Sequence, residues 1–359
     1  MRILHIMPHV GSGGDWTVVK TIMTLFQQNG HIVYLASKGA DKTSFRSIEL
    51  PINGGIIHFL SSLIRLLKSS YKFDIIHTHS PKCLLLGLLY RYISLQSIKL
   101  VFTFHLKTND SFIIKIFKTF LIKSASIVHV CSHDIASFIE EFYKVNPNKI
   151  KTCYIGIDHN LFHPQPDKKN IYRTKYQIPL NTFVLLFSGR LSPEKNIGVI
   201  LDYLALEQDP SIVLVVAGFG STYGELKQKS FDLGLADNVF FLGHISNNIS
   251  EIYIMSDLLV LPSINETFGM VVIEAAFCGL PVIRSATPGA TDQIINGYNG
   301  FILSPYETFS ISNLIKTLRM NQDYLSQVNH NAYIFAKNRF SLLSTYEDLI
   351  KLYTEALKN

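Results

Sequence analysis

Short apolar runs, each followed by a polar or glycine-containing loop and an amphipathic stretch, recur along the whole chain. Continuous apolar runs bounded by turn residues are typical of strands buried on both faces, as in a parallel sheet. The intervening stretches have the helical period, for example from near Gly269 to the stop at Gly279. This alternation predicts an α/β fold. The expected strands are 1–8, 31–37, 74–80, 99–105, 127–131, 183–189, 212–218, 239–243, 258–261, 281–284 and 299–303.

The alternation of expected strands and helices is interrupted once, in the proline-containing stretch 160–179, and then resumes. A chain of 359 residues also exceeds what one hydrophobic core usually supports. We therefore expect two Rossmann-like β/α/β domains, residues 1–165 and 166–340. A C-terminal helix over 341–359 is expected to cross back to the N-terminal domain.

The composition is apolar, with 47% hydrophobic and 17% charged residues, but it predicts no membrane span. The longest apolar stretches, 56–67 and 112–122, are too short and are interrupted by polar residues. The opening residues MRILHIMP form a short strand without the cleavage site of a signal peptide. The four cysteines lack metal-ligand spacing and are typical of reduced thiols. These features predict a cytoplasmic protein.

The net charge of +6 is unevenly distributed, because residues 1–165 hold 18 Lys and Arg against 9 Asp and Glu. In the stretches 58–72 and 112–123, basic residues alternate with apolar ones. Amphipathic basic helices suit an anionic membrane surface better than a nucleic-acid groove. The alternative is that both are ordinary core helices with solvated lysines on the outer face.

The stretch 261–291 contains the first candidate for chemistry, a loop followed by a helix that begins near Gly269. The first amides of a helix have no carbonyl partner, so the N–H groups of Gly269, Met270 and Val271 suit a phosphate. Glu266 and Glu274 flank this point and suit sugar or ribose hydroxyls. The alternative is that both carboxylates are solvated and only favour the helix dipole.

Two cations follow the first strand of the second half. Arg190 and Lys195 are five residues apart across a turn, where a guanidinium fork and an ammonium group suit a diphosphate. A plain surface loop is the alternative. The glycines at 11, 13 and 14 do not match the dinucleotide pattern G-x-G-x-x-G, because Trp16 occupies the last position. A nicotinamide dehydrogenase is therefore the weakest interpretation.

Two histidines stand at the ends of expected strands in the first half, His79 and His105. In doubly wound sheets, ligands bind beyond the carboxyl ends of the strands. These positions therefore favour a functional role for both, although a structural role is the alternative for each histidine taken alone.

In order and spacing, these motifs resemble the retaining family 4 of GT-B glycosyltransferases over nearly the whole chain. The motifs that carry the resemblance are Gly13-Gly14, Gly30-His31, 74–79, 103–105, 156–158 with Phe162 and Pro164, 188–190 with 194–196, Val239-Phe240 with Gly243, Pro262-Ser263, and Glu266 with Phe268, Gly269 and Glu274. The resemblance implies two Rossmann-like domains that face each other across a deep cleft. Departures occur at Ile155, Phe219 and Asp15-Trp16, where the family often has an Asn, an Asp and another acid.

The resemblance also implies roles for individual residues. Arg190 and Lys195 would neutralise the donor diphosphate and, with Glu266 and His105, form the catalytic set. The implied donor site comprises Gly13, Gly14, Arg190, Lys195, His244, Ile245, Glu266, Phe268, Gly269, Met270, Val271 and Glu274. The implied acceptor site comprises His79, His105 and Asp15.

The expected activity is transfer of a hexose or N-acetylhexosamine from a nucleotide-diphosphate sugar, most often a UDP-sugar in this family. The basic half favours a lipid-linked or lipopolysaccharide- or capsule-type glycan as acceptor, at the inner face of the cytoplasmic membrane. No metal or other cofactor is expected, because the two cations replace a metal and no Asp-x-Asp motif is poised to bind one. A nucleotide-sugar epimerase of the same architecture and a non-catalytic glycan- or nucleotide-binding protein are the alternatives.

Overall fold

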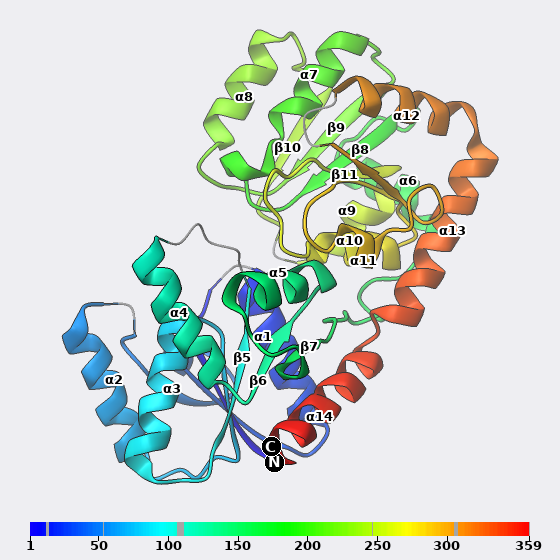
Figure 1. Ribbon diagram of the computed structural model, residues 1–359. Coiled ribbons are helices and arrows are strands. Elements are labelled where there is room, and N and C mark those ends of the chain that lie inside the picture. The colour runs from blue at the N-terminus through cyan, green and yellow to red at the C-terminus, as the bar shows by residue number, and fades with distance from the viewer. Residues whose placement is uncertain (12–13, 53, 106–110, 246, 305–307, 359) are drawn as a thin grey trace. The chain divides into compact units, whose positions relative to one another are not determined.

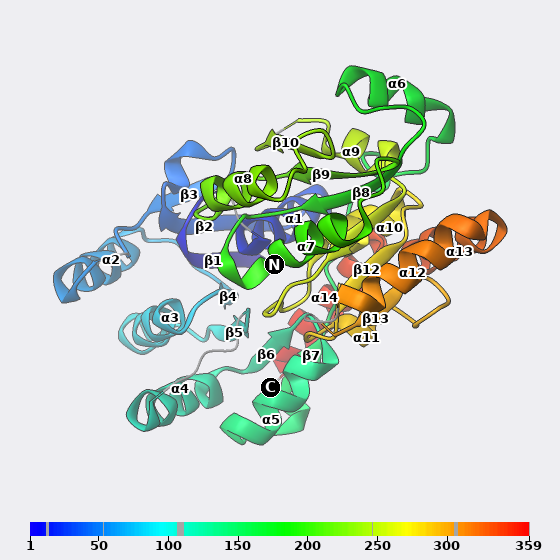
Figure 2. The same cartoon turned by 90° about the horizontal axis from the view of Figure 1, so that it is seen from above.

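The computed structural model describes residues 1–11, 14–52, 54–105, 111–245, 247–304 and 308–358. These residues form two compact units, of which unit 1 comprises Met1–Ile155 with Leu342–Asn359 and unit 2 comprises Gly156–Ser341. Each unit is built on one parallel sheet with helices packed against it (Figures 1 and 2). The α/β class expected from the apolar runs is confirmed.

The sheet of unit 1 has seven strands in the order β3-β2-β1-β4-β5-β6-β7, with every neighbouring pair parallel. The four central strands are buried along most of their length, as continuous apolar runs require. The strands are β1 (Arg2–His9), β2 (Ile32–Lys38), β3 (Arg46–Glu49), β4 (Ile75–Thr78), β5 (Lys99–Thr103), β6 (Ile127–Val130) and β7 (Ile150–Thr152).

Among the described residues, six helices belong to unit 1, and one of them comes from the far end of the sequence. Helices α2, α3 and α4 lie side by side in both views of the ribbon (Figures 1 and 2). Ser80 and Ser132 cap α3 and α5, because their hydroxyls accept from the amides of Cys83 and Ile135. The helices are α1 (Gly14–Gln28), α2 (Ile56–Lys68), α3 (Pro81–Ser94), α4 (Phe112–Ser124), α5 (His133–Tyr143) and α14 (Leu342–Lys358).

The sheet of unit 2 has six parallel strands in the order β10-β9-β8-β11-β12-β13. Counted from its own first strand, this is the same order as in unit 1 without its seventh strand. The strands are β8 (Phe183–Ser188), β9 (Ile212–Ala217), β10 (Val239–Gly243), β11 (Leu258–Leu261), β12 (Val282–Ser285) and β13 (Phe301–Leu303).

Helices surround the sheet of unit 2, and short 3-10 turns occur in both units. The helices are α6 (Lys169–Lys175), α7 (Gly198–Glu207), α8 (Tyr223–Asp232), α9 (Ile249–Met255), α10 (Met270–Phe277), α11 (Ala290–Gln293), α12 (Thr308–Met320) and α13 (Gln322–Arg339). The 3-10 turns are η1 (Ala40–Lys42), η2 (Pro147–Lys149), η3 (Pro166–Lys168) and η4 (Pro193–Lys195).

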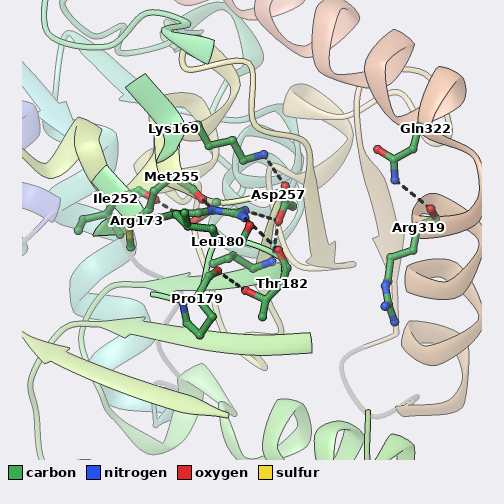
Figure 3. A network of polar contacts seen from close by, with 12 residues as sticks. Lys169, Arg173, Pro179, Leu180, Thr182, Ile252, Met255, Asp257, Arg319 and Gln322 are labelled. Carbon is green, nitrogen blue, oxygen red and sulfur yellow. Dashed lines mark hydrogen bonds and ion pairs between the residues drawn. The ribbon is translucent and has the colours of Figure 1, made fainter. Parts of the chain in front are cut away.

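A buried guanidinium fastens α6 to the start of the second sheet (Figure 3). Arg173 donates to Oδ2 of Asp257 at 2.7 Å and to the carbonyl oxygens of Met255, Leu180 and Thr182 at 2.8 to 3.0 Å. Oδ2 of Asp257 also accepts from the amide of Val184, the second residue of β8, at 2.6 Å. Every partner is a backbone carbonyl or a carboxylate of the scaffold, so this network stabilises the fold.

The observed boundary between the units precedes the expected one. We expected a break at residues 165 and 166, whereas unit 2 begins at Gly156. The reason is that 156–162 packs on unit 2: Ile157 forms a bridge with Ser341, and Phe162 contacts Tyr253 edge-on. The expected C-terminal helix corresponds to α14, which belongs to unit 1.

Candidate active site

The order of strands in unit 2 creates one point where connections leave in opposite directions, between the neighbours β8 and β11. At such a topological switch point the loops after the two strands separate, and ligands of open α/β sheets bind there. The loop after β8 carries Arg190 and Lys195, and the loop after β11 carries Glu266 and Gly269. Topology alone therefore places four predicted donor-site residues at one sheet edge.

An ion pair joins the two loops. Nζ of Lys195 lies 2.6 Å from Oε2 of Glu266, and the two side chains are only 19% and 15% exposed. The backbone holds the loops together as well, since the amide of Ile264 donates to the carbonyl of Glu194 at 2.8 Å. A salt bridge that is largely withdrawn from water is screened less than a surface pair, so the geometry of these two charges is well defined.

Arg190 is exposed in the same loop, and its charge affects the pKa of a neighbouring carboxylate. A hydrogen bond from Ser192 lowers the pKa of Glu194, and the charges of Lys195 and Arg190 lower it further. Both predicted cations thus act on one short segment. The exposed guanidinium of Arg190 is available to a ligand.

The loop that holds Arg190 packs closely against the backbone of the loop that follows β9. A Cβ atom at Gly218 would come within 1.8 Å of the carbonyl oxygen of Gly189, and one at Gly220 within 2.1 Å of that of Leu191. Only glycine permits this contact, so both positions are restricted to it. The amide of Leu191 donates to the carbonyl of Phe219 at 3.2 Å, which completes the contact between the loops.

Helix α10 begins beside the ion pair. Its N-cap, Gly269, has φ 79° and ψ 76°, a left-handed conformation that favours glycine. A Cβ atom at this position would lie 3.4 Å from Cγ of Glu266, so the carboxylate side chain passes directly over the helix start. Met270 and Val271 follow half-buried, and their amides belong to the first turn. This is the arrangement that favours an anion.

Glu274, one turn into α10, is tied to the end of β8. The hydroxyl of Tyr253 donates to its Oε2 at 2.6 Å and lies 3.2 Å from Oγ of Ser188. Burial raises the pKa of Glu274, and the Tyr253 hydrogen bond partly opposes the shift. The carboxylate is therefore pre-positioned by a neutral donor and retains oxygen lone pairs for a ligand hydroxyl.

A residue that the sequence did not single out lies under this site. Arg284 on β12 is 1% exposed, and its Nη1 donates to the carbonyl of Phe268 at 2.9 Å. Its Nη2 donates to Oγ1 of Thr287 at 2.9 Å, and the guanidinium also contacts Gln293, whose amide reaches the carbonyl of Gly269. Arg284 thus fixes the loop before α10. The signal in the sequence is an arginine inside an apolar strand, VIRS.

The remaining predicted donor residues lie at several places. His244 is exposed directly after β10, where Gly243 has φ 70°, and Ile245 is half-buried beside it. Phe268 is buried and contacts Phe340 edge-on. Gly14 opens helix α1 in unit 1. Gly13 lies outside the described residues.

The predicted acceptor residues belong to unit 1 and include two imidazoles that contact each other. His105 follows β5 and is half-buried, and its Nε2 lies 3.2 Å from Nδ1 of His79. His79 is 6% exposed, and its Nε2 lies 3.1 Å from Nδ1 of His5. Asp15, in the first turn of α1, opposes the burial that lowers the pKa of His105 to about 4. Both nitrogens of His79 are occupied by the neighbouring histidines His5 and His105.

Comparison with known proteins identifies the family. Residues 168–335 match the model of glycosyl transferases group 1, and residues 12–161 match that of glycosyltransferase family 4. The chain belongs to the family 4, group 1 glycosyltransferases. The resemblance expected from the motifs is confirmed, and so is the assignment as a transferase.

Curated relatives of this glycosyltransferase act on different acceptors. It is 29% identical over 235 residues to the D-inositol 3-phosphate glycosyltransferase of Stackebrandtia nassauensis, covering 62% of this chain and 52% of that one. It is also 29% identical over 317 residues to the UDP-Gal:α-D-GlcNAc-diphosphoundecaprenol α-1,3-galactosyltransferase of Escherichia coli, covering 84% and 80%. The chain therefore spans about half the length of the first relative and most of the second.

Solved structures confirm the GT-B fold of the glycosyltransferase. Anabaena HepE in complex with UDP superposes with a TM-score of 0.86 at 24% identity, covering 99% of this chain and 100% of that one. A glycosyltransferase from Rickettsia africae superposes with a TM-score of 0.88 at 23% identity, covering 100% and 99%. These similarities establish the architecture.

Proposed function

We propose that this glycosyltransferase transfers a hexose or N-acetylhexosamine from a UDP-sugar to a lipid-linked glycan of the lipopolysaccharide or capsule type, with retention of anomeric configuration. The observation that carries the proposal is the Lys195–Glu266 pair beside the start of α10 at the switch point of unit 2. The UDP complex of the HepE relative and the name of the Escherichia coli relative support the choice of donor and acceptor.

The donor would replace the ion pair by two separate contacts. In the proposal, Lys195 turns from Glu266 to the diphosphate, and Arg190 and the first amides of α10 share the remaining charge. Glu266 is then free to accept from a sugar hydroxyl, and Glu274 accepts from the ribose diol. The exchange gives Lys195 an anionic partner before and after binding and leaves the Glu266 carboxylate hydrogen-bonded, which limits the cost of desolvating them.

The transfer step needs a stabilised leaving group. As the bond between the anomeric carbon and the diphosphate oxygen breaks, charge develops on that oxygen, and the cations stabilise it electrostatically. We propose attack from the same face, in which the acceptor oxygen bonds to the anomeric carbon and its proton passes to the departing phosphate. No metal enters this scheme, so activity is expected to persist in EDTA.

One assay separates the candidate functions. The purified full chain is screened by thermal shift against UDP-, GDP- and ADP-sugars, since binding raises the apparent stability. The best donor is then incubated with and without a polyprenyl-diphosphate sugar, and the product anomer is read by NMR. Acceptor-dependent transfer with retention supports the proposal. Isomer exchange without acceptor indicates an epimerase, and no nucleotide binding indicates a non-catalytic protein.

The acceptor class is supported by an apolar and basic face of unit 1. On α4, five large side chains that share one helix face are more than half exposed, and α2 presents a similar stripe. Exposed apolar stripes of this kind mark an interaction site. The residues are Phe112, Ile113, Ile116, Phe117 and Phe120 on α4, and Ile56, Ile57, Leu60 and Ile64 on α2.

The basic residues beside this face indicate what kind of partner it binds. Arg65 and Lys68 on α2 and Lys123 on α4 are exposed beside the apolar stripes. Aromatic and aliphatic side chains flanked by cations suit the headgroup region of an anionic bilayer. No helix in the described part of the chain has the length and apolar character needed to span a bilayer. We therefore propose peripheral contact with an anionic membrane.

Vesicle co-sedimentation tests the contact. Binding to vesicles with phosphatidylglycerol should exceed binding to pure phosphatidylcholine, and Phe117→Ser with Phe120→Ser should lower it about tenfold or more. Phe231→Ser on α8 is the matched control, since Phe231 is 72% exposed in unit 2. Unchanged binding by the double variant, or a dimer that the double variant dissociates, would overturn the proposal.

A further inference from the structure

Five imidazoles lie together at the carboxyl edge of the sheet in unit 1, and only His105 among them belongs to the expected catalytic set. The rings of His77 and His79 stack with centroids 4.5 Å apart, and that of His5 lies 5.0 Å from His77. Register explains the grouping, because His5 on β1 pairs with His77 on β4. The five are His5, His77, His79, His105 and His129.

Burial keeps these imidazoles neutral. It lowers the pKa of His5 to about 3 and those of His105 and His129 to about 4. It also lowers the pKa values of His77 and His79 well below the usual range. A neutral imidazole has one N–H donor and one bare nitrogen acceptor. The direction of each hydrogen bond between such rings therefore depends on its neighbours.

One chain of hydrogen bonds has a fixed direction. Nε2 of His129 lies 3.0 Å from the carbonyl oxygen of Cys153, which can only accept, so the proton of His129 is on Nε2. Its Nδ1 then accepts from Thr103 at 2.9 Å, and Thr103 accepts from Nε2 of His77 at 2.6 Å. Nδ1 of His77 finally accepts from the hydroxyl of Tyr353 at 2.6 Å.

The second chain runs from His5 through His79 to His105 and has no such anchor. Among the described residues, Nε2 of His5 is buried and has no hydrogen-bond partner. A proton on this nitrogen would be a buried N–H without an acceptor, and such donors are rare in native proteins. The proton of His5 is therefore on Nδ1 and is donated to Nε2 of His79. His79 must then donate through Nδ1 to Nε2 of His105.

We propose that His5 and His79 are positioning residues that set the tautomer of His105. With Nε2 accepting from His79, His105 holds its own proton on Nδ1. It meets a ligand as a neutral hydrogen-bond donor and not as a base. Stacking against His77, whose direction is fixed, holds the ring of His79 in place. The consequence for sugar transfer rests on the proposed function, whereas the tautomer itself does not.

The tautomer is measured by ¹⁵N NMR of the full chain with labelled histidine, and His105 is assigned from the His105→Gln spectrum. The wild type should show Nδ1–H at His105. His79→Phe should convert it to the Nε2–H form that free histidine prefers, and His79→Gln should restore Nδ1–H because its amide can donate. His133→Phe, an exposed histidine of the same unit, is the control.

Several results would overturn the proposal. Nε2–H at His105 in the wild type contradicts it, and so does a His105 signal that His79→Phe leaves unchanged. One equivalent of zinc on His5, His77 and His79 would also replace it, since these nitrogens lie close enough to share an ion. If His79→Phe does not fold, His5→Phe tests the same chain from its inner end.

The effect on catalysis is measured separately from the tautomer. We expect kcat/KM to fall about tenfold in His79→Phe and to recover in His79→Gln, because one hydrogen bond to a substrate group is lost and then restored. If His79→Phe changes the tautomer of His105 but not kcat/KM, the proposed hydrogen-bond chain stands and His105 takes no part in the reaction. If the wild-type chain shows neither sugar transfer nor nucleotide binding, the proposed function itself is contradicted.

Discussion

The two sheets share one strand order and place their candidate residues at the same topological position, yet the chemistry of the two edges is opposite. In unit 2 the edge between β8 and β11 carries ions: Lys195 pairs with Glu266 above the buried cation Arg284. In unit 1 the edge between β1 and β4 carries neutral imidazoles, beginning with His5 and His79. A duplicated scaffold thus supports an anion site on one sheet and a hydrogen-bonding site on the other.

The largest expected difference between the edges is their response to acid. The folded pKa values of His5, His105 and His129 lie near 3 to 4, below the usual value of 6.5. At a pH between the folded and unfolded pKa values, the unfolded chain therefore binds more protons than the folded chain does. The stabilising contribution of these three histidines is therefore expected to be complete above about pH 6.5 and to be lost as the pH falls from there towards 4, at ~1.4 kcal/mol per histidine and pH unit.

Hydrogen exchange followed by mass spectrometry at pH 7, 6 and 5 checks this order of events. Peptides of unit 1 should lose protection first, and Trp16, the one tryptophan of the chain, should report the same transition by fluorescence. Simultaneous loss of protection in both units would show that the neutral edge does not control acid stability.

Removing a charge from the other edge should act on catalysis. Lys195→Ala is expected to lower kcat/KM for sugar transfer by about 10²–10³-fold, the usual cost of losing one stabilising group at a leaving oxygen. The chain should still fold, although its unfolding free energy should fall because Glu266 is left without its partner. Lys229→Ala, which removes a surface ion pair with Asp202 in the same unit, is the control. Comparable rates for both variants would remove Lys195 from the site.

Arg284→Met tests whether the buried cation supports the charged edge. The loss of hydrogen bonds to Phe268 and Thr287 should destabilise the chain by about 2–4 kcal/mol in urea unfolding and weaken nucleotide binding. Arg284→Lys should not rescue it, because an ammonium cannot reproduce the fork. Arg319→Met, which removes a half-exposed pair with Asp209, should cost less than about 1 kcal/mol.

Tyr353→Phe gives the smallest expected effect and probes the neutral edge. It removes the donor to the buried Nδ1 of His77, so the unfolding free energy should fall by about 1–2 kcal/mol. Tyr346→Phe, whose partner His31 is only half-buried, should cost less. An equal cost for both variants would mean that the direction assigned to the first hydrogen-bond chain has no energetic consequence.

Much of the fold could be predicted because its central strands are continuous apolar runs. The expected ranges 239–243 and 258–261 coincide with β10 and β11. The strands β3 and β7 were not predicted, because Arg46–Glu49 and Ile150–Thr152 are short edge strands with polar residues and no apolar run. Such strands are held by pairing with a neighbour, which local pattern does not reveal.

The candidate site could be predicted only as separate pieces. Spacing placed Lys195 and Glu266 in two loops, but their mutual ion pair spans 71 residues and depends on topology. His5, His77 and His129 were not singled out, since they lie inside strands that otherwise look like core. A usable signal was present in Asp74–His79, because alternation along a strand puts His77 and His79 on one face.

Helix α14 is the last element of the chain, yet it supplies Tyr353 to the first sheet. During synthesis on the ribosome, β1 through β7 emerge long before this tyrosine, and all of unit 2 must be translated in between. The nascent first lobe therefore lacks the donor to His77 until the segment that carries Tyr353 has been translated, and its maturation is coupled to synthesis of unit 2.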